Sequence, residues 1–388
     1  MHINKYTLIR NLALLCIAGN MVGWLFPFPN MVWRVGLVLL CLYVIVFEEG
    51  KRLPCEKALL FFVAFNLLHF FISFLWKSPS YTQIGNILCA LLPLSLFVCL
   101  SQKGVMTDRF ITVMGIVLLI TAILQYYHYI RMAILRSGVD EDTDITNNAS
   151  AAMLMLLPML FLMKNQIQKW ITLFVCLFFI LSSAKRGNIL AAVIPSVLFV
   201  YSMLKESRRS GIKIFIVLAV IVAGSIMTYR WIENNDYLIY RIEKTQEGNI
   251  SGRDEIYAGA WHAWYDSDSF ANQLFGAGFD GILKLESTKH RHAHNDWLEV
   301  LFNYGLLGVV LYLAVFITLF LQVRRIKSFD MRMAFLSGLL IWFFKTLYSM
   351  GFTGESLSVA MISMGTAWGW YKTERNQAFT ANSASVEE

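Results

Sequence analysis

Long apolar stretches, each followed by a short polar segment, recur along most of this chain of 388 residues. Most of them span about 17–22 residues, and a helix of about 20 residues crosses the roughly 30 Å hydrocarbon core of a bilayer. The composition agrees, because 57% of the residues are hydrophobic and only 15% are charged, against roughly 45–50% and about 25% in soluble domains. The sequence therefore predicts an all-α polytopic membrane protein.

We expect about twelve transmembrane helices from the lengths of these stretches. Their approximate ranges are 8–26, 31–47, 58–76, 84–101, 110–130, 148–163, 168–183, 189–204, 212–231, 298–321, 331–349 and 355–371. The chain then divides into transmembrane helices 1–9 (1–231), one large loop (232–297), transmembrane helices 10–12 (298–371), and a polar tail (372–388). The polarity of this tail predicts that it is disordered and cytoplasmic.

The loops between the expected helices alternate in charge. One set holds most of the Lys and Arg residues, whereas the short loops of the other set hold few and the 131–147 loop is acidic. Because Lys and Arg collect on the cytoplasmic side, we expect both chain termini in the cytoplasm and the 232–297 loop outside. The net charge is +7, but the basic residues are dispersed between apolar blocks, which argues against a nucleic-acid partner.

The 232–297 loop is expected to contain short helices. Ser251-Gly-Arg253-Asp254 has the pattern of a helix start, and the aromatic side of the helix that follows suits the lipid headgroup zone. Gly276-Ala-Gly278-Phe-Asp-Gly281 predicts a tight turn. This string also matches the dinucleotide-binding fingerprint, but it follows no predicted strand and faces a compartment without nucleotides. We therefore set the dinucleotide interpretation aside.

His290-Arg-His292-Ala-His294 is the densest cluster of ionisable groups in the chain. One interpretation is a zinc site, but no obvious set of carboxylate or thiolate ligands accompanies the cluster. A second is an interfacial His run that anchors the next helix. The third is a general base at the membrane surface, because the near-neutral pKa of His suits that task. We favour the third and expect no metal.

Several basic residues lie on the outer side, against the charge rule. Lys185 and Arg186 occupy a hairpin tip too short to leave the membrane interface. Arg253 lies at the start of its predicted helix, and Lys345 lies in the outer half of another. A guanidinium group binds phosphate through two parallel hydrogen bonds, and helix N-termini favour anions. These residues indicate an anionic ligand, with structural ion pairing as the alternative.

The chain contains the pair His294-Asn295, followed by Gly305 after nine further residues and by Gly308 after two more. This pattern resembles the signature of the O-antigen ligase family, which many polysaccharide polymerases share. Other family-like features accompany this signature over about 145–325: Asn147-Asn148-Ala149, Ser183-Ala-Lys185-Arg186-Gly187, Ser251-Gly-Arg253 with Tyr257, and Leu274-Phe-Gly276-Ala-Gly278-Phe279.

The resemblance implies a GT-C-like membrane glycosyltransferase in the bacterial inner membrane, with its active site on the periplasmic face. Such an enzyme transfers a glycan from an undecaprenyl-pyrophosphate donor to a sugar hydroxyl, without metal or cofactor. The implied partners are this lipid-linked donor, a lipid A–core or lipid-linked glycan acceptor, and membrane lipid. The absence of a nucleotide-site pattern in the sequence agrees with a donor of this kind.

The resemblance, read with the chemistry of the residues, also suggests their roles. His294 is the expected base, and the expected catalytic cations are Arg186 and Arg253, which neutralise the leaving pyrophosphate. The expected substrate-binding residues are Lys185, Tyr257, Asn295 and Lys345.

The acceptor distinguishes the members of the family. A ligase passes the glycan to lipid A–core, whereas a polymerase passes it to the next lipid-linked repeat unit. Some polymerases show Arg-x10-Gly in two large external loops; Arg241 and Gly252 match once, but neither Arg131 nor Arg136 does. We therefore favour the ligase. A glycan or lipid transporter is the alternative of another class, and the internal repeats expected of one are not found.

Overall fold

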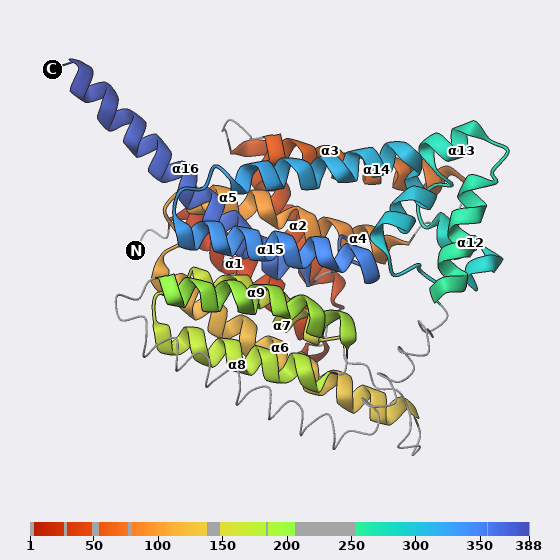
Figure 1. The fold of residues 1–388 in the computed structure, drawn as a ribbon, viewed down its shortest axis with the longest axis horizontal. Helices are drawn as coiled ribbons and strands as arrows, with labels where there is room; N and C mark the ends of the chain where they lie inside the picture. The colour runs from red at the N-terminus through yellow and green to blue at the C-terminus, as the bar shows by residue number, and fades with distance from the viewer. Residues whose placement is uncertain are drawn as a thin grey trace.

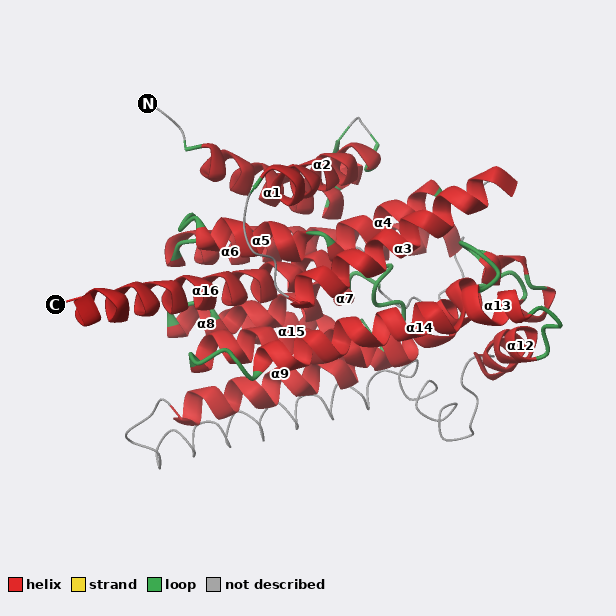
Figure 2. Cartoon of the chain, turned by 90° about the horizontal axis from the view of Figure 1, so that it is seen from above, coloured by secondary structure: helices red, strands yellow, loops and turns green. Residues whose placement is uncertain are grey.

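The computed structural model describes residues 4–26, 29–48, 54–76, 80–137, 148–183, 185–205, 253–354 and 356–387. The predicted helix at 212–231 and the pair Arg241 and Gly252 lie outside these ranges. Throughout the described part, the secondary structure is helical and contains no strand (Figure 2). The expected all-α class is therefore confirmed for these residues.

The helices follow one another along the chain with short connections. Those of the first half are α1 (Lys5–Met21), η1 (Gly23–Leu25), α2 (Met31–Phe47), α3 (Pro54–Trp76), α4 (Tyr81–Leu91), α5 (Pro93–Gln102), α6 (Asp108–Ser137), α7 (Ser150–Leu156), η2 (Leu157–Phe161), α8 (Gln166–Ser182) and α9 (Arg186–Lys205). Those after the gap are α12 (Arg253–Tyr265), α13 (Phe270–Phe275), η3 (Gly281–Lys284), η4 (Glu286–Thr288), α14 (Asp296–Val323), α15 (Phe329–Tyr348) and α16 (Leu357–Glu387).

Five helical segments of the described chain are long and apolar enough to cross a membrane. They are Glu56–Leu75, Tyr81–Gln102, Asp108–Met132, Arg186–Lys205 and Asp296–Val323. Shorter apolar helices are Met31–Phe47, Ser150–Phe161 and Gln166–Ser182. These segments agree with a multi-pass membrane protein, and the number twelve stays a prediction.

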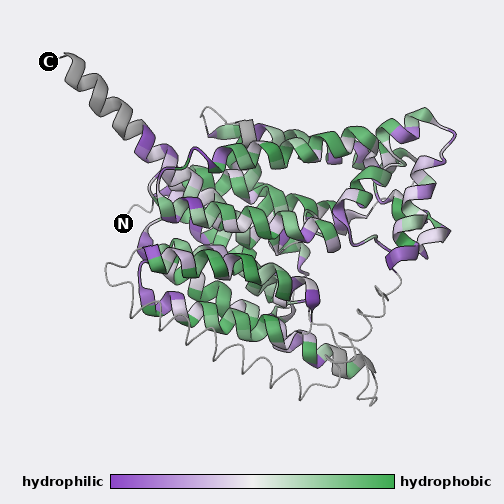
Figure 3. Cartoon of the chain, viewed as in Figure 1, coloured by the Kyte–Doolittle hydropathy of each residue, from purple (hydrophilic) through white to green (hydrophobic). Residues whose placement is uncertain are grey.

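Large apolar side chains also cover the outside of the bundle. Leu75 is 78% exposed, Phe47 is 70% exposed and Val46 is 67% exposed. Figure 3 shows hydrophobic residues along the helix shafts and hydrophilic ones mainly near their ends. Exposed apolar surface on this scale is unusual for a soluble monomer, whereas lipid chains provide a suitable surrounding.

The helices pack side by side along most of their length (Figure 1). Among the contacting pairs are α14 with α3, α15 with α9, and α16 with both α15 and α5. Glycine brings α16 close to α5, because a Cβ on Gly365 would lie 2.8 Å from the Leu94 carbonyl oxygen, and Gly369 faces Val98 one turn later. Small residues four apart are a common feature of close helix packing in membranes.

The helix α16 extends to Glu387, across the 372–388 stretch that we expected to be a disordered tail. This stretch contains neither Gly nor Pro after Gly369, and Glu374, Arg375 and Ala378 favour helix. Polarity alone therefore did not predict its conformation, because helix propensity continues where the apolar pattern ends.

The residues from Arg253 to Ala293 form a small helical cap at one end of the bundle (Figures 1 and 2). The helix α12 starts at Arg253, as its sequence pattern predicted. This cap has its own apolar core, made of Ile256, Ala260, Ile282, Ala293 and Phe302. Because Phe302 belongs to α14, the core fixes the cap on the first turns of that helix.

Candidate functional site

A cavity of about 230 Å³ lies at the end of the bundle where α15 stops and α14 begins. Its lining comes from α1, α6, α7, the segments just before α9 and α14, the end of α15, the loop after α15 and the start of α16. The basic residues in this lining are Lys185, His294 and Lys345, and no Asp or Glu is among the described residues that line it. The cavity is therefore suited to an anion.

His294 occupies an unusual backbone position beside this cavity. Its φ is 52°, in the left-handed region, and it directly precedes Asn295, the N-cap of α14. The Asn295 side-chain oxygen accepts hydrogen bonds from Trp297 N at 3.0 Å and Leu298 N at 3.2 Å, while its amide donates to the Leu347 carbonyl at 2.9 Å. Asn295 therefore ties the start of α14 to the end of α15 and fixes the backbone next to His294.

Asp296 holds the loop that follows α15. This fully buried carboxylate accepts hydrogen bonds from Gly351 N at 2.8 Å, Phe352 N at 3.1 Å and the Tyr312 hydroxyl at 2.8 Å. The loop contributes Met350 to the cavity wall. Asp296 therefore positions part of the site without lining it.

Glu299 stabilises the segment that holds the three clustered histidines, residues 290–294. Its buried carboxylate accepts a hydrogen bond from Ala293 N at 2.6 Å and lies 3.2 Å from His292 Nδ1. Burial alone would lower the pKa of His292, but Glu299 outweighs burial and the pKa is raised. His290 contacts the Leu283 carbonyl at 3.1 Å. Of the three histidines, only His294 lines the cavity.

The environment of His294 favours the neutral imidazole. His294 is exposed toward the cavity, but the protein atoms around it exclude part of its solvation and lower its pKa to about 4, with further lowering by the charges of Arg253, His292 and Lys185. A neutral His accepts a proton, so the free site holds this residue in the form a general base requires.

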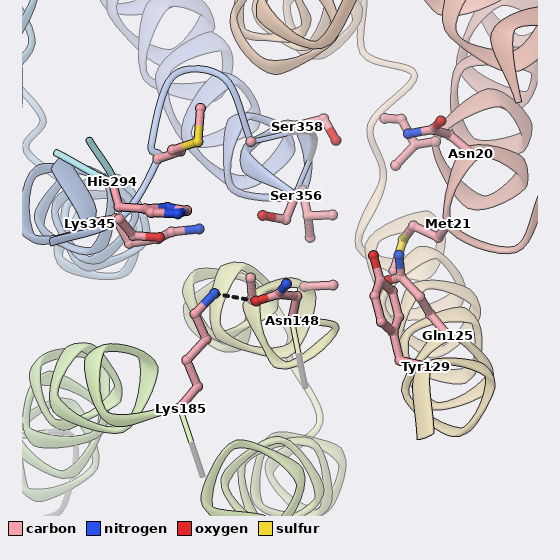
Figure 4. Close-up of a pocket in the computed structure, with 17 residues that line it drawn as sticks. Asn20, Met21, Gln125, Tyr129, Asn148, Lys185, His294, Lys345, Ser356 and Ser358 are labelled. Atoms are coloured by element: carbon pink, nitrogen blue, oxygen red, sulfur yellow. Dashed lines mark hydrogen bonds between the residues drawn. The ribbon is translucent and has the colours of Figure 1, made fainter. Parts of the chain in front are cut away.

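Two lysines carry most of the positive charge of the cavity wall. Lys185 Nζ donates a hydrogen bond to Asn148 Oδ1 at 2.7 Å (Figure 4), and burial and Arg253 lower its pKa to about 8. Lys345 is only 3% exposed, and Figure 4 shows its ammonium group directed into the cavity. In the described part of the chain Lys345 has no hydrogen-bond or ion-pair partner. The Asp296 carboxylate acts on this charge without forming an ion pair with it. A buried ammonium group compensated only in this way is costly, so an anion in the cavity would be stabilised.

Arg253 lies beside the cavity and does not line it. Its Nη1 donates to the Tyr348 carbonyl at 2.9 Å, which uses one of five guanidinium N–H donors. Burial raises the pKa of Tyr257, and interactions with Arg253 and Asn295 partly offset this rise. Arg253, Tyr257 and Asn295 thus form a neighbouring group behind His294.

Arg186 is the first residue of α9 and does not line the cavity, although its neighbour Lys185 does. The first turn of α9 is fixed by Tyr348, whose hydroxyl donates to the Gly187 carbonyl at 2.7 Å. The Tyr348 ring occupies the space where a Cβ of residue 187 would lie. Gly187 therefore allows the end of α15 to contact the turn that carries Lys185.

The glycines of the His294-Asn295 signature have a packing role. Gly305 breaks α14 with a φ of 66°, and a Cβ there would clash with the backbone of Leu274 and Gly276. Gly276, with φ of 80°, in turn faces the backbone of Asn303. The Gly276–Gly281 turn lies between α13 and η3 with no strand beside it, so it serves to dock the cap on α14.

No group of three or more His, Cys, Asp or Glu residues is placed to hold a metal ion in the part of the chain that the structure describes. Metal independence stays a prediction. Of the predicted site residues, the structure gathers Lys185, His294 and Lys345 around one cavity, with Arg253, Tyr257 and Asn295 behind His294 and Arg186 beside Lys185.

The fold and this cavity define a class: a multi-pass helical membrane protein with a cation-lined polar site at one end of its bundle. The family described as O-antigen ligase matches residues 171–313. The match confirms, over this segment, the resemblance seen in the motifs. It includes every predicted site residue except Lys345. A comparison with curated proteins found no match.

Proposed function

We propose that this protein is a membrane glycosyltransferase that moves a glycan from undecaprenyl pyrophosphate to a sugar hydroxyl. The observation that carries the proposal is the buried, unpaired Lys345 beside Lys185 and His294 in a cavity without acidic lining among the described residues. A pyrophosphate supplies the missing negative charge, and a base beside it is what glycosyl transfer requires.

In the proposed reaction the acceptor hydroxyl attacks the anomeric carbon of the donor sugar. The bond between that carbon and the pyrophosphate oxygen breaks as the new glycosidic bond forms. His294 accepts the proton of the hydroxyl, and the lipid pyrophosphate leaves with the bonding electrons. Lys185, Lys345 and Arg253 stabilise the charge on the leaving group, with Arg186 adding to the field from the start of α9. Tyr257 and Asn295 position Arg253 and His294.

We also propose about twelve spans, with both termini cytoplasmic and the cap on the periplasmic side of a bacterial inner membrane. In support, α1, α6, α8 and α15 reach the cavity end with their C-termini, whereas α9, α14 and α16 begin there. The opposite ends carry the basic loops, including Lys103, Arg109, Lys205 and Arg332, as the positive-inside rule requires.

The proposed acceptor is lipid A–core, which makes the enzyme an O-antigen ligase. The one Arg-x10-Gly match, at Arg241 and Gly252, favours the second candidate, a repeat-unit polymerase of the same family. Purified protein in liposomes should be given a lipid-linked glycan donor with either acceptor. Product on lipid A–core supports the ligase, and longer lipid-linked glycan supports the polymerase.

The same assay tests the pyrophosphate contacts. Arg253→Lys should lose much of the rate, and Arg253→Ala about 10²–10³-fold, by analogy with removal of one oxyanion donor. The matched control is Arg291→Lys, because Arg291 is exposed and does not line the cavity. Transfer at the full rate by Arg253→Lys and Lys345→Met would show that these cations do not hold the leaving group.

A further inference from the structure

The two sides of the cavity differ in charge. Figure 4 shows Lys185, His294 and Lys345 on one side, while the opposite side presents Gln125 and Tyr129. The second side also includes Asn20, and the hydroxyl of Ser356 lies between the two sides. We refer to Asn20, Gln125, Tyr129 and Ser356 as the neutral wall. Every member bears an uncharged polar group.

Three members of the neutral wall come from α1 and α6, and Ser356 directly precedes α16. Gln125 and Tyr129 are four residues apart on α6, so they share one face of that helix. Asn20 lies at the end of α1, and its side-chain oxygen accepts a hydrogen bond from Arg34 Nε at 3.0 Å. Arg34 therefore orients Asn20, much as Asn148 fixes Lys185 on the other side.

Gln125 is the member that most needs a ligand. It lies within the apolar span Asp108–Met132, and within the described residues its amide has no hydrogen-bond partner. Gln125 is half-buried and faces the cavity, and a polar group at such a place in a membrane helix is a candidate for ligand binding. Its amide both donates and accepts hydrogen bonds, as neighbouring sugar hydroxyls do.

The cavity is also small. Its volume of about 230 Å³ lies below the range of about 300–1,000 Å³ typical of pockets for drug-sized ligands. It therefore suits one sugar ring beside a phosphate group better than a whole repeat unit.

We propose that the neutral wall is a subsite for the first sugar of the donor, the one bonded to pyrophosphate, and that this sugar is uncharged. This inference rests on the proposed function. The cationic side holds the pyrophosphate, and the amides and hydroxyls opposite bind the ring hydroxyls. The Tyr129 ring offers an apolar face for the sugar.

The test measures binding to purified protein in nanodiscs. The probes are undecaprenyl pyrophosphate alone and the same lipid carrying one glucose, galactose, N-acetylglucosamine or N-acetylgalactosamine. For wild type, at least one sugar should tighten binding on the order of tenfold, as one or two net hydrogen bonds provide. Gln125→Leu should remove this gain and leave the affinity for the sugar-free lipid unchanged.

Ser356→Ala is the second variant, because it alters the protein least, and it should reduce the gain in the same way. Gln83→Leu is the matched control, since Gln83 is a half-buried glutamine on α4 that does not line the cavity. The inference would be overturned, with the proposed function left standing, by either of two results. In one, no sugar increases the affinity of the wild-type protein for the lipid. In the other, the Gln125→Leu and Ser356→Ala proteins keep the full increase. Failure of the sugar-free lipid to bind wild type would instead overturn the proposed function, and this inference with it.

Discussion

At the scale of single residues, His294 is held in a conformation that does not favour its side chain. Its φ of 52° lies in the region where residues with a Cβ are strained by roughly 1–2 kcal/mol. The Asn295 side chain maintains it there, because it accepts hydrogen bonds from Trp297 N and Leu298 N and donates one to the Leu347 carbonyl. Strain of this kind is often found at functional sites.

This strain predicts opposite effects on activity and stability. His294→Gly and His294→Ala should both lose transfer by about 10²–10⁴-fold, the usual contribution of base catalysis. Glycine relieves the backbone strain and alanine does not. His294→Gly should therefore have the higher melting temperature of the two, measured in detergent. Equal melting temperatures would contradict the strain, and normal transfer would contradict the base.

The charges around His294 also predict the pH dependence of transfer. Its pKa of about 4 means that the neutral form is lost only as pH falls through about 4, so the acid limb of kcat/KM should lie well below 6.5. A bound pyrophosphate offsets the charges of Lys185 and Arg253 and raises the pKa. The acid limb of kcat should therefore lie at higher pH than that of kcat/KM. The reverse order would contradict this electrostatic picture.

At the scale of elements, α14 performs two tasks because Gly305 interrupts it. The turns before the break carry Asp296 and Glu299, which bind the loop after α15 and the His segment. The turns after the break continue as an apolar span. At the break, the backbone of α14 packs directly against the backbone of the turn around Gly276.

Gly305→Ala should consequently destabilise the protein more than backbone strain alone explains. A matched control is Gly104→Ala: Gly104 has a φ of 72°, close to the 66° of Gly305, but nothing lies within 4 Å of its Cβ position. Both substitutions carry a positive-φ cost, which at Gly305 (φ 66°, ψ −167°) is about 1–3 kcal/mol because this region is essentially restricted to glycine, and only Gly305→Ala adds a backbone clash. Thermal unfolding of both variants measures the difference. Equal losses would mean that the cap adjusts freely at this contact.

The sequence predicted part of this arrangement and missed the rest for identifiable reasons. Lys185, His294 and Lys345 stood out because a charged or titratable side chain near a membrane helix end is unusual. Asn20, Gln125 and Ser356 did not, because single neutral polar residues within apolar blocks are common. Asp296 and Glu299 were overlooked as ordinary acidic residues of a first helical turn, although their burial shows that they fix the site.

At the scale of the whole molecule, apolar block lengths predicted the helical class because hydropathy is a local property. They did not show that Tyr81–Gln102 is two helices, α4 and α5, joined at Leu92, or that α7 continues as η2. The cavity depends on segments more than 300 residues apart, from Asn20 to Ser356. No local pattern brings such segments together.

The proposed topology is tested by cysteine labelling. In a background without native cysteines, a cysteine at Asn272, exposed on α13, should react with a membrane-impermeant thiol reagent in intact spheroplasts. A cysteine at Lys164, in the exposed turn between η2 and α8, should react only after lysis. The opposite pattern would invert the topology and the compartment of the site.

Four hydrogen bonds hold the end of α15 and the loop after it through their main-chain atoms. Asn295 and Arg253 bind the carbonyls of residues 347 and 348, and Asp296 binds the amides of residues 351 and 352. Apart from the glycine at 351, whose missing Cβ leaves room for the Asp296 carboxylate, these bonds do not depend on which side chains occupy the segment. A relative that kept Arg253, Asn295 and Asp296 would retain these four bonds even if most side chains of its 347–352 segment had changed. Divergence there would therefore be poor evidence for a change of chemistry.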